Sequence, residues 1–377
     1  METEKRFELI TRNTEEVLTP DELRNYLEIG MPLKHYIGFE ISGFIHLGTG
    51  LMTMAKVKDF IEAEVKCNVF LADWHTWINN KLGGDFELIK KVAVGYFKEG
   101  MKASMLCWKG DPEKIGFILG SELYAQKDKL YWETVIDVSR HTTLARVLRS
   151  ITIMGRKEGE AVNFAQLLYP PMQVADIFAI GVNLAHGGID QRKAHVIAKE
   201  VAKKLVYNAL IYKGEKYEPI AIHHPLLMGL QPPPKWPIKQ EEIKQVISEM
   251  KMSKSIPYSA IFIHDSEEEI KQKIDKAFCP EGNISYNPIL QYTKLLLFNQ
   301  KKFVLNVERE RKYGGDIAYD SYEKLEQDFA QKKLHPKDLK NAVALALIKL
   351  LEPARKYFKQ PRIKKLLEGL KGLKITR

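Results

Sequence analysis

Short apolar segments that alternate with helical patterns are the feature that most restricts how this chain can fold. Residues 35–39 and 69–72 have the length and apolar content of buried strands. Apolar residues then recur at helical spacing from Gly48 to Ile61, and again after Asp85, which can cap the second helix. Strands that alternate with helices of this length are typical of a parallel α/β sheet. We therefore predict an α/β fold with a Rossmann-like sheet.

The second part of the chain has a different pattern. A further strand is predicted at residues 219–223, before the proline-rich stretch 231–234, which we interpret as a boundary. The later residues predict mostly helices, over 268–278, 287–298 and 336–358. Near the N-terminus, residues 19–22 predict a capping box with proline at the first helical position, and Gly30 predicts the end of that helix.

These patterns divide the chain into three parts. Residues 1–230 form the parallel-sheet domain, which carries an inserted helical segment, and residues 231–265 form a linker. Residues 266–377 form an α-helical C-terminal domain. A chain of 377 residues is long enough to build both domains with a sizeable core.

Composition excludes several classes of protein. No apolar run approaches the roughly 20 residues that a membrane helix needs, and the first six residues are too charged for a signal peptide. We therefore expect a cytoplasmic protein with no membrane partner. Cys67, Cys107 and Cys279 lie far apart without regular Cys/His spacing, which argues against a disulfide framework and a structural metal site.

The charge of the chain points to a polyanionic partner. The formal net charge is +10, and residues 359–377 hold seven Lys or Arg against one acid, Glu368. Basic surfaces bind phosphates but also serve solubility. We leave two interpretations of this tail open, a phosphate-facing segment and a disordered one.

Two short segments carry side chains suited to nucleotide chemistry. Residues 46–50 read His-Leu-Gly-Thr-Gly after the first predicted strand, and residues 251–255 read Lys-Met-Ser-Lys-Ser. Histidine and lysine can stabilise charge that develops at the phosphates of ATP, and glycine at 48 lets a flat base approach the backbone. Alone, the first segment is a strand–helix corner and the second a surface loop. Together, in this order, they favour an ATP site.

A third segment, residues 169–178, has the composition of a buried helix. The prolines at 170 and 171 fit a helix start. Tyr169, Gln173 and Asp176 are spaced so that they fall on one side of that helix. A buried carboxylate needs a partner, which is either an internal network or a polar group of a ligand.

Tyr36 lies on the strand that precedes His46, so we expect it beside the same crevice as Asp176. A phenol and a carboxylate that face each other form a receptor for a substrate hydroxyl. This arrangement suits tyrosine better than tryptophan or phenylalanine. His75 directly follows the second predicted strand, and the turn at Gly187-Gly188 precedes Asp190, Gln191, Arg192 and Lys193.

With these segments in place, the chain resembles the tyrosyl-tRNA synthetases of the archaeal and eukaryotic type, which are class I aminoacyl-tRNA synthetases. The resemblance covers most of the chain and is carried by residues 36–40, 46–48, 71–75, 169–176, 190–193, 251–255 and 334–341. It implies an enzyme that activates L-tyrosine with Mg²⁺-ATP and charges tRNA(Tyr), with no tightly bound protein metal. It also implies a homodimer, a catalytic domain at 1–230 and an anticodon-binding domain at 266–377.

The resemblance implies a role for each matching residue. Tyr36 and Asp176 would hold the tyrosine hydroxyl, His75 would line the pocket, and Tyr169, Gln173 and Gln191 would bind the α-amino and carboxyl end. His46, Gly48, Asp190, Lys251, Ser253 and Lys254 would bind ATP, and His46, Thr49, Lys251 and Lys254 would serve catalysis. Arg149, Arg192 and Lys193 would contact the acceptor stem, and His335 and Asp338 the first anticodon base.

The chain departs from the family pattern at one position. The first motif of the family usually ends in a second histidine, where this chain has Thr49. A threonine offers one hydroxyl but no imidazole and no positive charge. We therefore expect His46 and the two lysines, or a water, to carry more of the phosphate contact.

Three alternatives stay open from the sequence. A tryptophanyl-tRNA synthetase shares the architecture, although the pairing of Tyr36 with Asp176 argues against it. A non-catalytic RNA-binding protein with this fold would not need His46, Lys251 and Lys254. A small-molecule nucleotidyltransferase could share the His-Gly motif but would not need a basic tail and a helical C-terminal domain.

Overall fold

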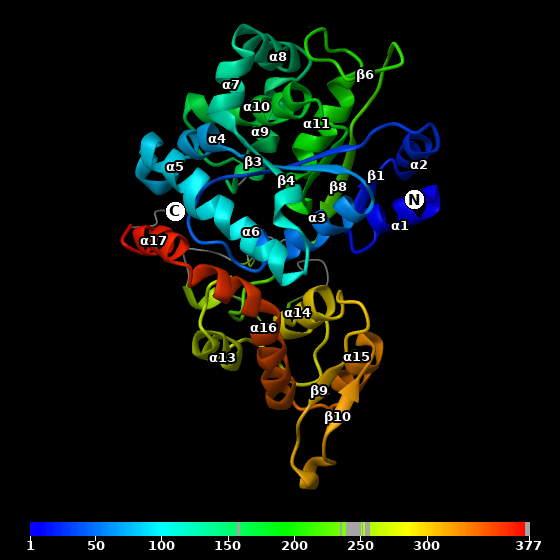
Figure 1. Ribbon diagram of the computed structural model, residues 1–377, viewed down its shortest axis with the longest axis vertical. Coiled ribbons are helices and arrows are strands. Elements are labelled where there is room, and N and C mark those ends of the chain that lie inside the picture. The colour runs from blue at the N-terminus through cyan, green and yellow to red at the C-terminus, as the bar shows by residue number, and fades with distance from the viewer. Residues whose placement is uncertain (157–158, 234–235, 239–249, 251, 253–256, 374–377) are drawn as a thin grey trace.

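The protein has two lobes, which Figure 1 shows one above the other. The structure is a computed structural model that describes residues 1–156, 159–233, 236–238, 250, 252 and 257–373. The sheet lobe contains residues up to 233, and the C-terminal lobe contains residues 257–373. Within the described residues, no helix is both long and apolar enough to cross a membrane.

A six-stranded sheet forms the centre of the sheet lobe. In spatial order its strands are β1 (Glu16–Leu18), β8 (Ile220–His224), β5 (Leu184–Gly188), β2 (Lys34–Phe39), β3 (Lys66–Leu71) and β4 (Ile115–Leu119). Only the pairing of β1 with β8 is antiparallel. The chain builds outward from β2 to β3 and β4, then returns to place β5 on the other side of β2. The predicted α/β class with a parallel sheet is confirmed.

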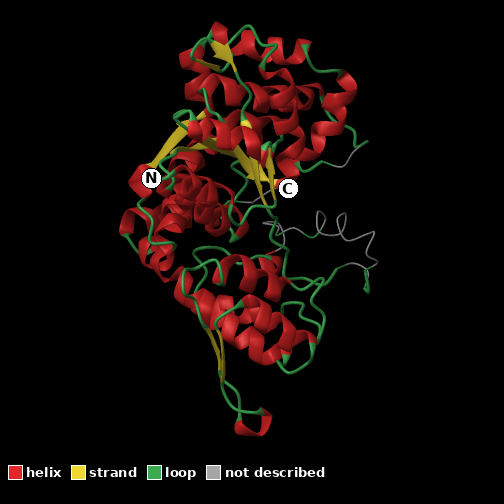
Figure 2. Ribbon diagram, turned by 90° about the vertical axis from the view of Figure 1, so that its right-hand side faces the viewer, coloured by secondary structure: helices red, strands yellow, loops and turns green. Residues whose placement is uncertain are grey.

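Helices cover both faces of this sheet, as Figure 2 shows. They are α1 (Thr3–Thr11), α2 (Pro20–Glu28), α3 (Thr53–Glu62), α4 (Asp73–Ile78), α5 (Phe86–Val92), α6 (Lys98–Cys107), α7 (Gly120–Lys127), α8 (Lys129–Arg140), α9 (Leu144–Ser150), α10 (Phe164–Ile180) and α11 (Arg192–Ala202). Two π-helical segments, η1 (Gly48–Met52) and η3 (Ala93–Phe97), precede α3 and α6, and short 3₁₀ segments lie at Lys81–Gly84 (η2), Pro112–Lys114 (η4), Ile151–Met154 (η5) and Ile189–Gln191 (η6). A small hairpin, β6 (Ile211–Tyr212) and β7 (Glu215–Lys216), follows α11.

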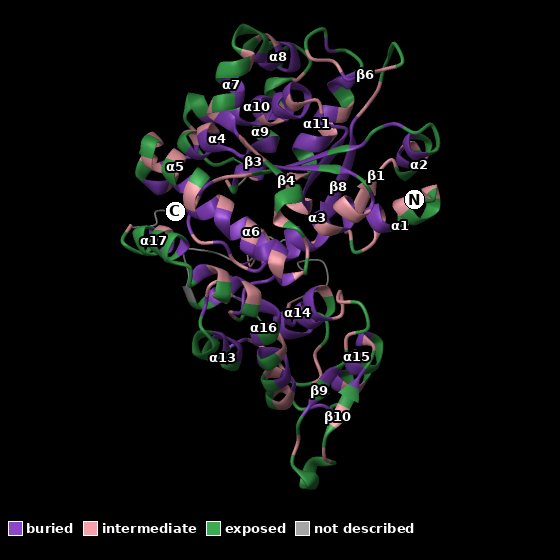
Figure 3. Ribbon diagram, in the orientation of Figure 1, coloured by how far each residue is buried: buried purple, intermediate pink, exposed green. Residues whose placement is uncertain are grey.

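The alternation of side chains along β2 divides the core in two. Ile37 packs into a large apolar cluster with α1, α2, α3 and α6, and this cluster continues into the C-terminal lobe. Tyr36, one position earlier, packs into a second cluster with α7, α8, α10 and α11. Figure 3 shows this burial along the sheet and the helices that face it. Successive residues of a strand point to opposite faces, so one strand serves both cores.

The C-terminal lobe is mainly helical but not entirely so. Its helices are α13 (Glu267–Asp275), α14 (Pro288–Tyr292), α15 (Tyr322–Ala330), α16 (Pro336–Phe358) and α17 (Pro361–Lys371), with η8 (Pro257–Ser259), η9 (Thr293–Leu297) and η10 (Arg311–Tyr313). The sequence prediction missed an antiparallel hairpin of β9 (Leu305–Val307) and β10 (Ile317–Tyr319), which projects at the foot of Figure 1. Its strands are three residues long, too short to show a periodic pattern.

The basic C-terminal tail is ordered over most of its length. α17 buries Ile363, Leu367 and Leu370 and packs against η3 of the sheet lobe. Arg362 forms an ion pair with Glu99 of α6 across the two lobes at 2.5 Å. The disordered interpretation of this tail is therefore wrong for residues 361–371. The other interpretation, that this tail faces a phosphate, stays a prediction.

Two of the predicted helix starts were wrong. At the start of α2, Pro20 is the first helical residue as predicted, but Thr19 has φ +58° and its side chain caps no backbone N–H, so there is no capping box. α10 begins six residues before Pro170, at a capping box formed by Asn163 and Gln166. Both prolines therefore lie inside the helix. The capping box and the burial of most of α10 outweigh the backbone hydrogen bonds that they remove.

Candidate active site

The candidate site lies where the order of the parallel strands reverses, between β2 and β5. From β2 the chain continues toward β3 on one side, and from β5 it continues toward β8 on the other. The loops after these two strands diverge and leave a crevice at their carboxyl ends, where open α/β sheets bind ligands. His46 follows β2 and Asp190 follows β5, so these two of the six predicted ATP residues lie at this reversal.

The side chain of His46 is oriented by the turn that follows it. Its Nδ1 accepts the backbone N–H groups of Gly48 and Thr49 at 3.1 and 3.2 Å. Because Nδ1 accepts, the proton of the neutral ring lies on Nε2, which is 3.0 Å from Oγ1 of Thr49. The hydroxyl of Thr49 therefore accepts from His46 and keeps its own proton to donate. A Cβ on Gly48 would approach the ring to 3.2 Å, so glycine leaves room for this arrangement.

Segments distant in sequence are bonded to this turn. The N–H of Leu47 donates to the carbonyl of Ile261 at 3.0 Å, and the N–H of Ile263 donates to the carbonyl of Ile45 at 3.1 Å. On the other side, the N–H of Met252 donates to Leu227 at 2.9 Å. Met252, the described residue of the second motif, and residues 261–263 after it are therefore hydrogen-bonded to segments around the crevice. Lys251, Ser253 and Lys254, which we predicted to bind ATP, lie outside the described residues.

The carboxylate of Asp190 folds back over Gly188. A Cβ built on Gly188 would lie 2.7 Å from Oδ1 of Asp190 and 2.8 Å from Leu226, so only glycine fits there. Gly188 in turn pairs with His224 on β8. The position of Asp190 is therefore defined by the ends of two strands.

A buried carboxylate forms the centre of a second group of polar side chains. Asp176, on α10, is 1% exposed, and the hydroxyl of Tyr131 donates to its Oδ1 at 3.0 Å. Nε2 of His75, on α4, lies 3.6 Å from Oδ2, which is longer than a hydrogen bond. Burial, and next the negative charge of Asp176, raise the pKa of Tyr36 on β2 well above its ordinary value. Tyr36, His75 and Asp176 are therefore brought together as predicted.

Several buried polar atoms in this group have no hydrogen-bond partner among the described residues. They include Oδ2 of Asp176, both ring nitrogens of His75 and Oε1 of Gln173. Burial raises the pKa of Asp176 well above its ordinary value, while the hydrogen bond from Tyr131 acts in the opposite direction. Burial lowers the pKa of His75 to about 3, so its ring is neutral at pH 7. Unpaired buried polar atoms cost free energy, which a polar ligand between them would recover.

The other polar residues of α10 lie on the same side of the helix. Nε2 of Gln173 donates to Oε1 of Gln191 at 3.0 Å, and Nε2 of Gln191 donates to the carbonyl of Ile153 at 3.0 Å. The ring of Tyr169 packs edge-on against His75 with centroids 4.6 Å apart. The predicted convergence of Tyr169, Gln173 and Asp176 is therefore observed.

Sequence reasoning missed two tyrosines of this group. Tyr131 is the hydrogen-bond donor to Asp176, and Tyr124 stacks on Tyr131 with ring centroids 4.0 Å apart. Tyr124 ends up on α7 and Tyr131 on α8, across a break at Asp128 with φ +48°. The spacing of seven residues is a weak signal in a stretch whose helices could not be delimited from the sequence.

Comparison with known proteins identifies the family. Residues 29–352 match the family described as class I tRNA synthetases for tryptophan and tyrosine (W and Y). The tyrosine–tRNA ligase of Thermococcus sibiricus is 60% identical over 380 residues, and that of Pyrococcus furiosus is 59% identical over 379, each with 100% of both chains covered. The chain belongs to the tyrosine–tRNA ligases of class I.

Solved structures agree with this membership of the tyrosine–tRNA ligases. Tyrosyl-tRNA synthetase from Pyrococcus horikoshii, solved with L-tyrosine, superposes with a TM-score of 0.94 at 57% identity, covering 98% of this chain and 100% of that one. The enzyme from Aeropyrum pernix superposes with a TM-score of 0.82 at 40% identity, covering 98% and 99%. The resemblance inferred from the motifs is confirmed at the level of the family.

In a tyrosine–tRNA ligase, basic residues near the crevice are candidates for RNA contact. Nζ of Lys193, at the start of α11, donates to the backbone carbonyl of Arg149 on α9 at 2.7 Å, so these two residues are neighbours. Arg192 lies beside Lys193 in sequence but pairs with Glu16 of β1 at 2.8 Å. The three predicted acceptor-stem residues therefore lie at one end of the sheet lobe, with Arg192 already held by an acid.

The two residues predicted to meet the anticodon lie at the start of α16. His335 caps this helix: its Nδ1 accepts the N–H of Lys337 at 3.2 Å, and the side chain is exposed. Asp338 lines a surface cavity together with Lys271, Asn306 and other residues from α13 and β9. His335 and Asp338 are one helical turn apart, so they share the end of one element.

Proposed function

We propose that this chain joins L-tyrosine to the α-phosphate of ATP and then transfers the tyrosyl group to tRNA(Tyr). In the first step a carboxylate oxygen of tyrosine attacks the α-phosphorus, and the bond to pyrophosphate breaks. In the second step a ribose hydroxyl of the tRNA attacks the tyrosyl carbonyl, and AMP leaves. No side-chain nucleophile is needed, so the protein contributes binding, orientation and charge.

The observation that carries this proposal is that the buried Oδ2 of Asp176, next to His75, has no hydrogen-bond partner among the described residues. A tyrosine hydroxyl at this position would donate to Asp176 and accept from Tyr36, which would satisfy both groups. Phenylalanine has no hydroxyl and would leave them unpaired. Tyrosyl-tRNA synthetases are themselves the reference case for such selectivity, with phenylalanine rejected by about 10⁵.

The remaining residues of the pocket would hold the other end of the amino acid. Oε1 of Gln173, buried without a partner among the described residues, would accept from the α-ammonium group. Tyr169 and Gln191 flank it, and His75 closes the pocket against Tyr169. This arrangement would direct the carboxylate of tyrosine toward the crevice between β2 and β5.

At the nucleotide end, His46 and Thr49 would stabilise the charge that develops on the phosphates, together with Lys251 and Lys254. Gly48 would admit the adenine, Asp190 would bind the ribose and Ser253 the phosphates. Magnesium would enter with ATP as part of the substrate. The backbone bonds that tie Met252 and residues 261–263 to the crevice support a position of the second motif close to His46.

For tRNA we propose the domain roles that the sequence implied. Residues 1–230 would form the catalytic domain and receive the acceptor stem at Arg149, Arg192 and Lys193. Residues 231–265 would form the linker that carries the second motif. Residues 266–377 would bind the anticodon at His335 and Asp338. Charged aminoacyl-tRNA is consumed by ribosomes, so we place the enzyme in the cytoplasm.

A homodimer is supported by apolar side chains exposed on the sheet lobe. Leu144 and Leu148 lie one turn apart on α9, and Phe164 and Leu168 lie one turn apart on α10, which packs against α9. Phe164 is 79% exposed. Exposure of this apolar surface to water costs free energy, and a second copy of the chain would cover it. Phe164→Asp should convert a dimer to a monomer in analytical ultracentrifugation, and a parent chain that sediments as a monomer would refute this assembly.

The experiment that tests the proposed function is ATP–pyrophosphate exchange with tyrosine, tryptophan and phenylalanine side by side. Exchange with tyrosine alone is the expected result. Exchange with tryptophan would be consistent with the fold but would contradict the assignment of the pocket to tyrosine. Charging of tRNA(Tyr) with labelled tyrosine then tests the second step.

A further inference from the structure

Three buried histidines form a row on the face of the sheet opposite the tyrosine pocket. His35, His186 and His224 lie on the adjacent strands β2, β5 and β8. Nε2 of His35 is 3.1 Å from Nδ1 of His186, and Nε2 of His186 is 2.9 Å from Nδ1 of His224. The rings of His35 and His186 pack against Phe60 of α3, with centroids 4.9 and 5.3 Å away. None of these residues has a role in the proposed function.

The hydrogen bonds of this row fix which nitrogens carry protons. Burial lowers the pKa of His35 to about 3 and that of His224 to about 4, and it lowers the pKa of His186 well below 6.5, so all three rings are neutral at pH 7. Nδ1 of His35 is buried without a partner among the described residues. An unpaired buried N–H is rarer than an unpaired acceptor, which places the proton of His35 on Nε2. Each ring then donates to the next, and His224 carries its proton on Nε2.

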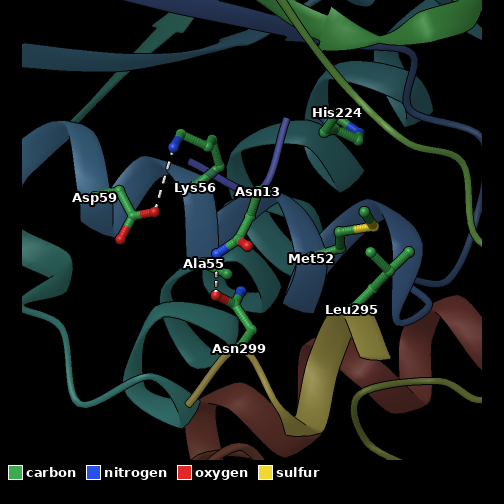
Figure 4. Close-up of a pocket in the computed structure, with 8 residues that line it drawn as sticks. All are labelled: Asn13, Met52, Ala55, Lys56, Asp59, His224, Leu295 and Asn299. Carbon is green, nitrogen blue, oxygen red and sulfur yellow. Dashed lines mark hydrogen bonds and ion pairs between the residues drawn. The ribbon is translucent and has the colours of Figure 1, made fainter. Parts of the chain in front are cut away.

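His224, at the end of the row, lies between Asp190 and the helix that begins at Gly48, which are two parts of the proposed ATP site. His224 pairs with Gly188, and Oδ1 of Asp190 lies 2.7 Å from where a Cβ of Gly188 would be. Paired residues on parallel strands point to the same face, so His224 and the carboxylate of Asp190 are neighbours. His224 also lines a small cavity with Met52 of η1, the helix that begins at Gly48 (Figure 4).

We propose that His224 is a positioning residue for ATP, whose Nε2–H orients the carboxylate of Asp190 toward the ribose hydroxyls. The hydrogen bonds from His35 to His186 and from His186 to His224 occupy Nδ1 of His224 and so keep its proton on Nε2. A neutral donor orients the carboxylate without removing its charge, so the carboxylate keeps its strength as an acceptor. The inference rests on the proposed role of Asp190 in ribose binding.

The test compares ATP with 2′-deoxyATP and 3′-deoxyATP in tyrosine-dependent pyrophosphate exchange. We expect His224→Phe to lower kcat/KM for ATP by about tenfold, the size of one hydrogen bond to a charged group, and to reduce the preference for ATP over the deoxy analogues. The KM for tyrosine should not change. His35→Phe, which removes only the first donor of the row, should shift the preference in the same direction by a smaller factor.

His195→Phe is the matched control. His195 is equally buried and bonds another histidine, His223, at 2.9 Å, but it lies on the opposite face of the sheet. It should lower stability without changing the preference for ATP.

Asp190→Ala separates this inference from the proposed function. If Asp190→Ala retains the preference for ATP, the ribose role of Asp190 is wrong. If Asp190→Ala abolishes the preference while His224→Phe retains it, only the positioning role of His224 is overturned. Where His224→Phe does not fold, retention of the preference by His35→Phe overturns that role. The His35 variant leaves the site itself unaltered, so the result stands even if His224→Phe does not fold.

Discussion

At the scale of single residues, Asp176 combines near-complete burial with a carboxylate oxygen that has no partner among the described residues. Most buried carboxylate oxygens in proteins accept at least one hydrogen bond. Asp137 on α8 is an example, because its Oδ2 accepts the backbone N–H groups of Val206 and Tyr207 at 2.6 and 3.3 Å. The difference between these two aspartates separates a ligand site from a structural contact within one lobe.

Replacement of Asp176 should affect tyrosine and not ATP. We expect Asp176→Asn to lower kcat/KM for tyrosine in pyrophosphate exchange by about 100-fold, because the carboxyl group that would bind the substrate hydroxyl is replaced by an amide. The KM for ATP should stay within about twofold of the parent value. Asp137→Asn should instead lower the thermal midpoint and leave the KM for tyrosine unchanged. Parent-like tyrosine kinetics in Asp176→Asn would show that Asp176 does not bind the hydroxyl of the substrate.

The same substitution should alter how stability depends on pH. Because the pKa of Asp176 is raised in the folded state, folded protein holds a proton there that unfolded protein loses above pH 3.8. Stability therefore falls as the pH rises from 3.8 toward the folded pKa, by at most about 1.4 kcal/mol per pH unit. We expect Asp176→Asn to gain stability relative to the parent as the pH rises from 3.8 toward the folded pKa of Asp176 in urea titrations. A constant difference across this range would contradict the raised pKa.

Thr49 should act through its hydroxyl. Thr49→Val removes the acceptor for Nε2 of His46, and a neutral hydrogen bond of this kind is worth about 1 kcal/mol. We expect kcat for pyrophosphate exchange to fall by about fivefold with an unchanged KM for tyrosine. Thr49→Ser keeps the hydroxyl and should restore the parent rate. Equal rates in all three proteins would show that the contact does not serve catalysis.

The sequence predicted most of the site because its residues belong to contiguous motifs. His46, Tyr36 and the polar side of α10 could be placed from strand ends and helical spacing. Tyr131 could not, since its approach to Asp176 depends on how α7 and α8 fold back, 45 residues away in sequence. The hydrogen bond from His46 to Thr49 could not be predicted either, because rotation of the imidazole decides it.

At the scale of elements, the turn from β2 into α3 depends on one close backbone approach. A Cβ at Gly50, within η1, would lie 2.5 Å from Ile45 and 2.5 Å from Ser104 of α6. The absence of this one side chain lets the helix begin against α6, which places His46 over the crevice. The helix was predicted from its apolar spacing, but the requirement for glycine at 50 was not, because the contacting residues are distant in sequence.

Two glycine substitutions should therefore have opposite effects. Gly50→Ala should lower the free energy of unfolding by about 2 kcal/mol or more and reduce exchange activity, because Ile45 and α6 must move. Gly369→Ala on α17 should raise the free energy of unfolding by up to about 1 kcal/mol. No atom lies within 4 Å of the Cβ position of residue 369, and alanine favours a helix. Chemical denaturation of the two variants is the measurement. A neutral Gly50→Ala would mean that the turn adapts.

Element boundaries were the weaker part of the sequence prediction, for a physical reason. α16 was predicted over the residues that it occupies, because a proline at its start and a long apolar repeat mark it. α10 was misplaced because prolines usually open helices, whereas here burial of most of the helix overrides that preference. Local signals decide an element only where tertiary packing does not outweigh them.

At the scale of the whole molecule, six of the ten histidines of the chain are buried. Burial lowers the pKa of His35, His75 and His264 to about 3 and that of His224 to about 4, and it lowers the pKa of His186 and His195 well below 6.5. In the unfolded chain each of these rings binds a proton below about pH 6.5. Folding therefore releases protons under mildly acidic conditions.

Acid should destabilise the protein well above the pH at which carboxylates titrate. Below pH 6.5 the unfolded state binds more protons than the folded state, so stability rises with pH and is lost as the pH falls toward 4. Each buried histidine contributes at most about 1.4 kcal/mol per pH unit in this range. We expect urea midpoints to fall steeply between pH 6.5 and pH 5. Midpoints that stay constant over this interval would show that the rings titrate normally.

The anchoring of α16 has a consequence for which tRNAs the enzyme can charge. This helix has 23 residues, which corresponds to about 35 Å, and starts with the proposed anticodon contacts at His335 and Asp338. At its other end Phe358 packs on Tyr96 of the sheet lobe, with ring centroids 5.8 Å apart. Because α16 is anchored at one end, the distance from the sheet lobe to the proposed anticodon contacts is fixed. A tRNA must therefore match this distance as well as present the right bases. Selection by distance would then reject tRNAs of altered shape even where every individual contact could form.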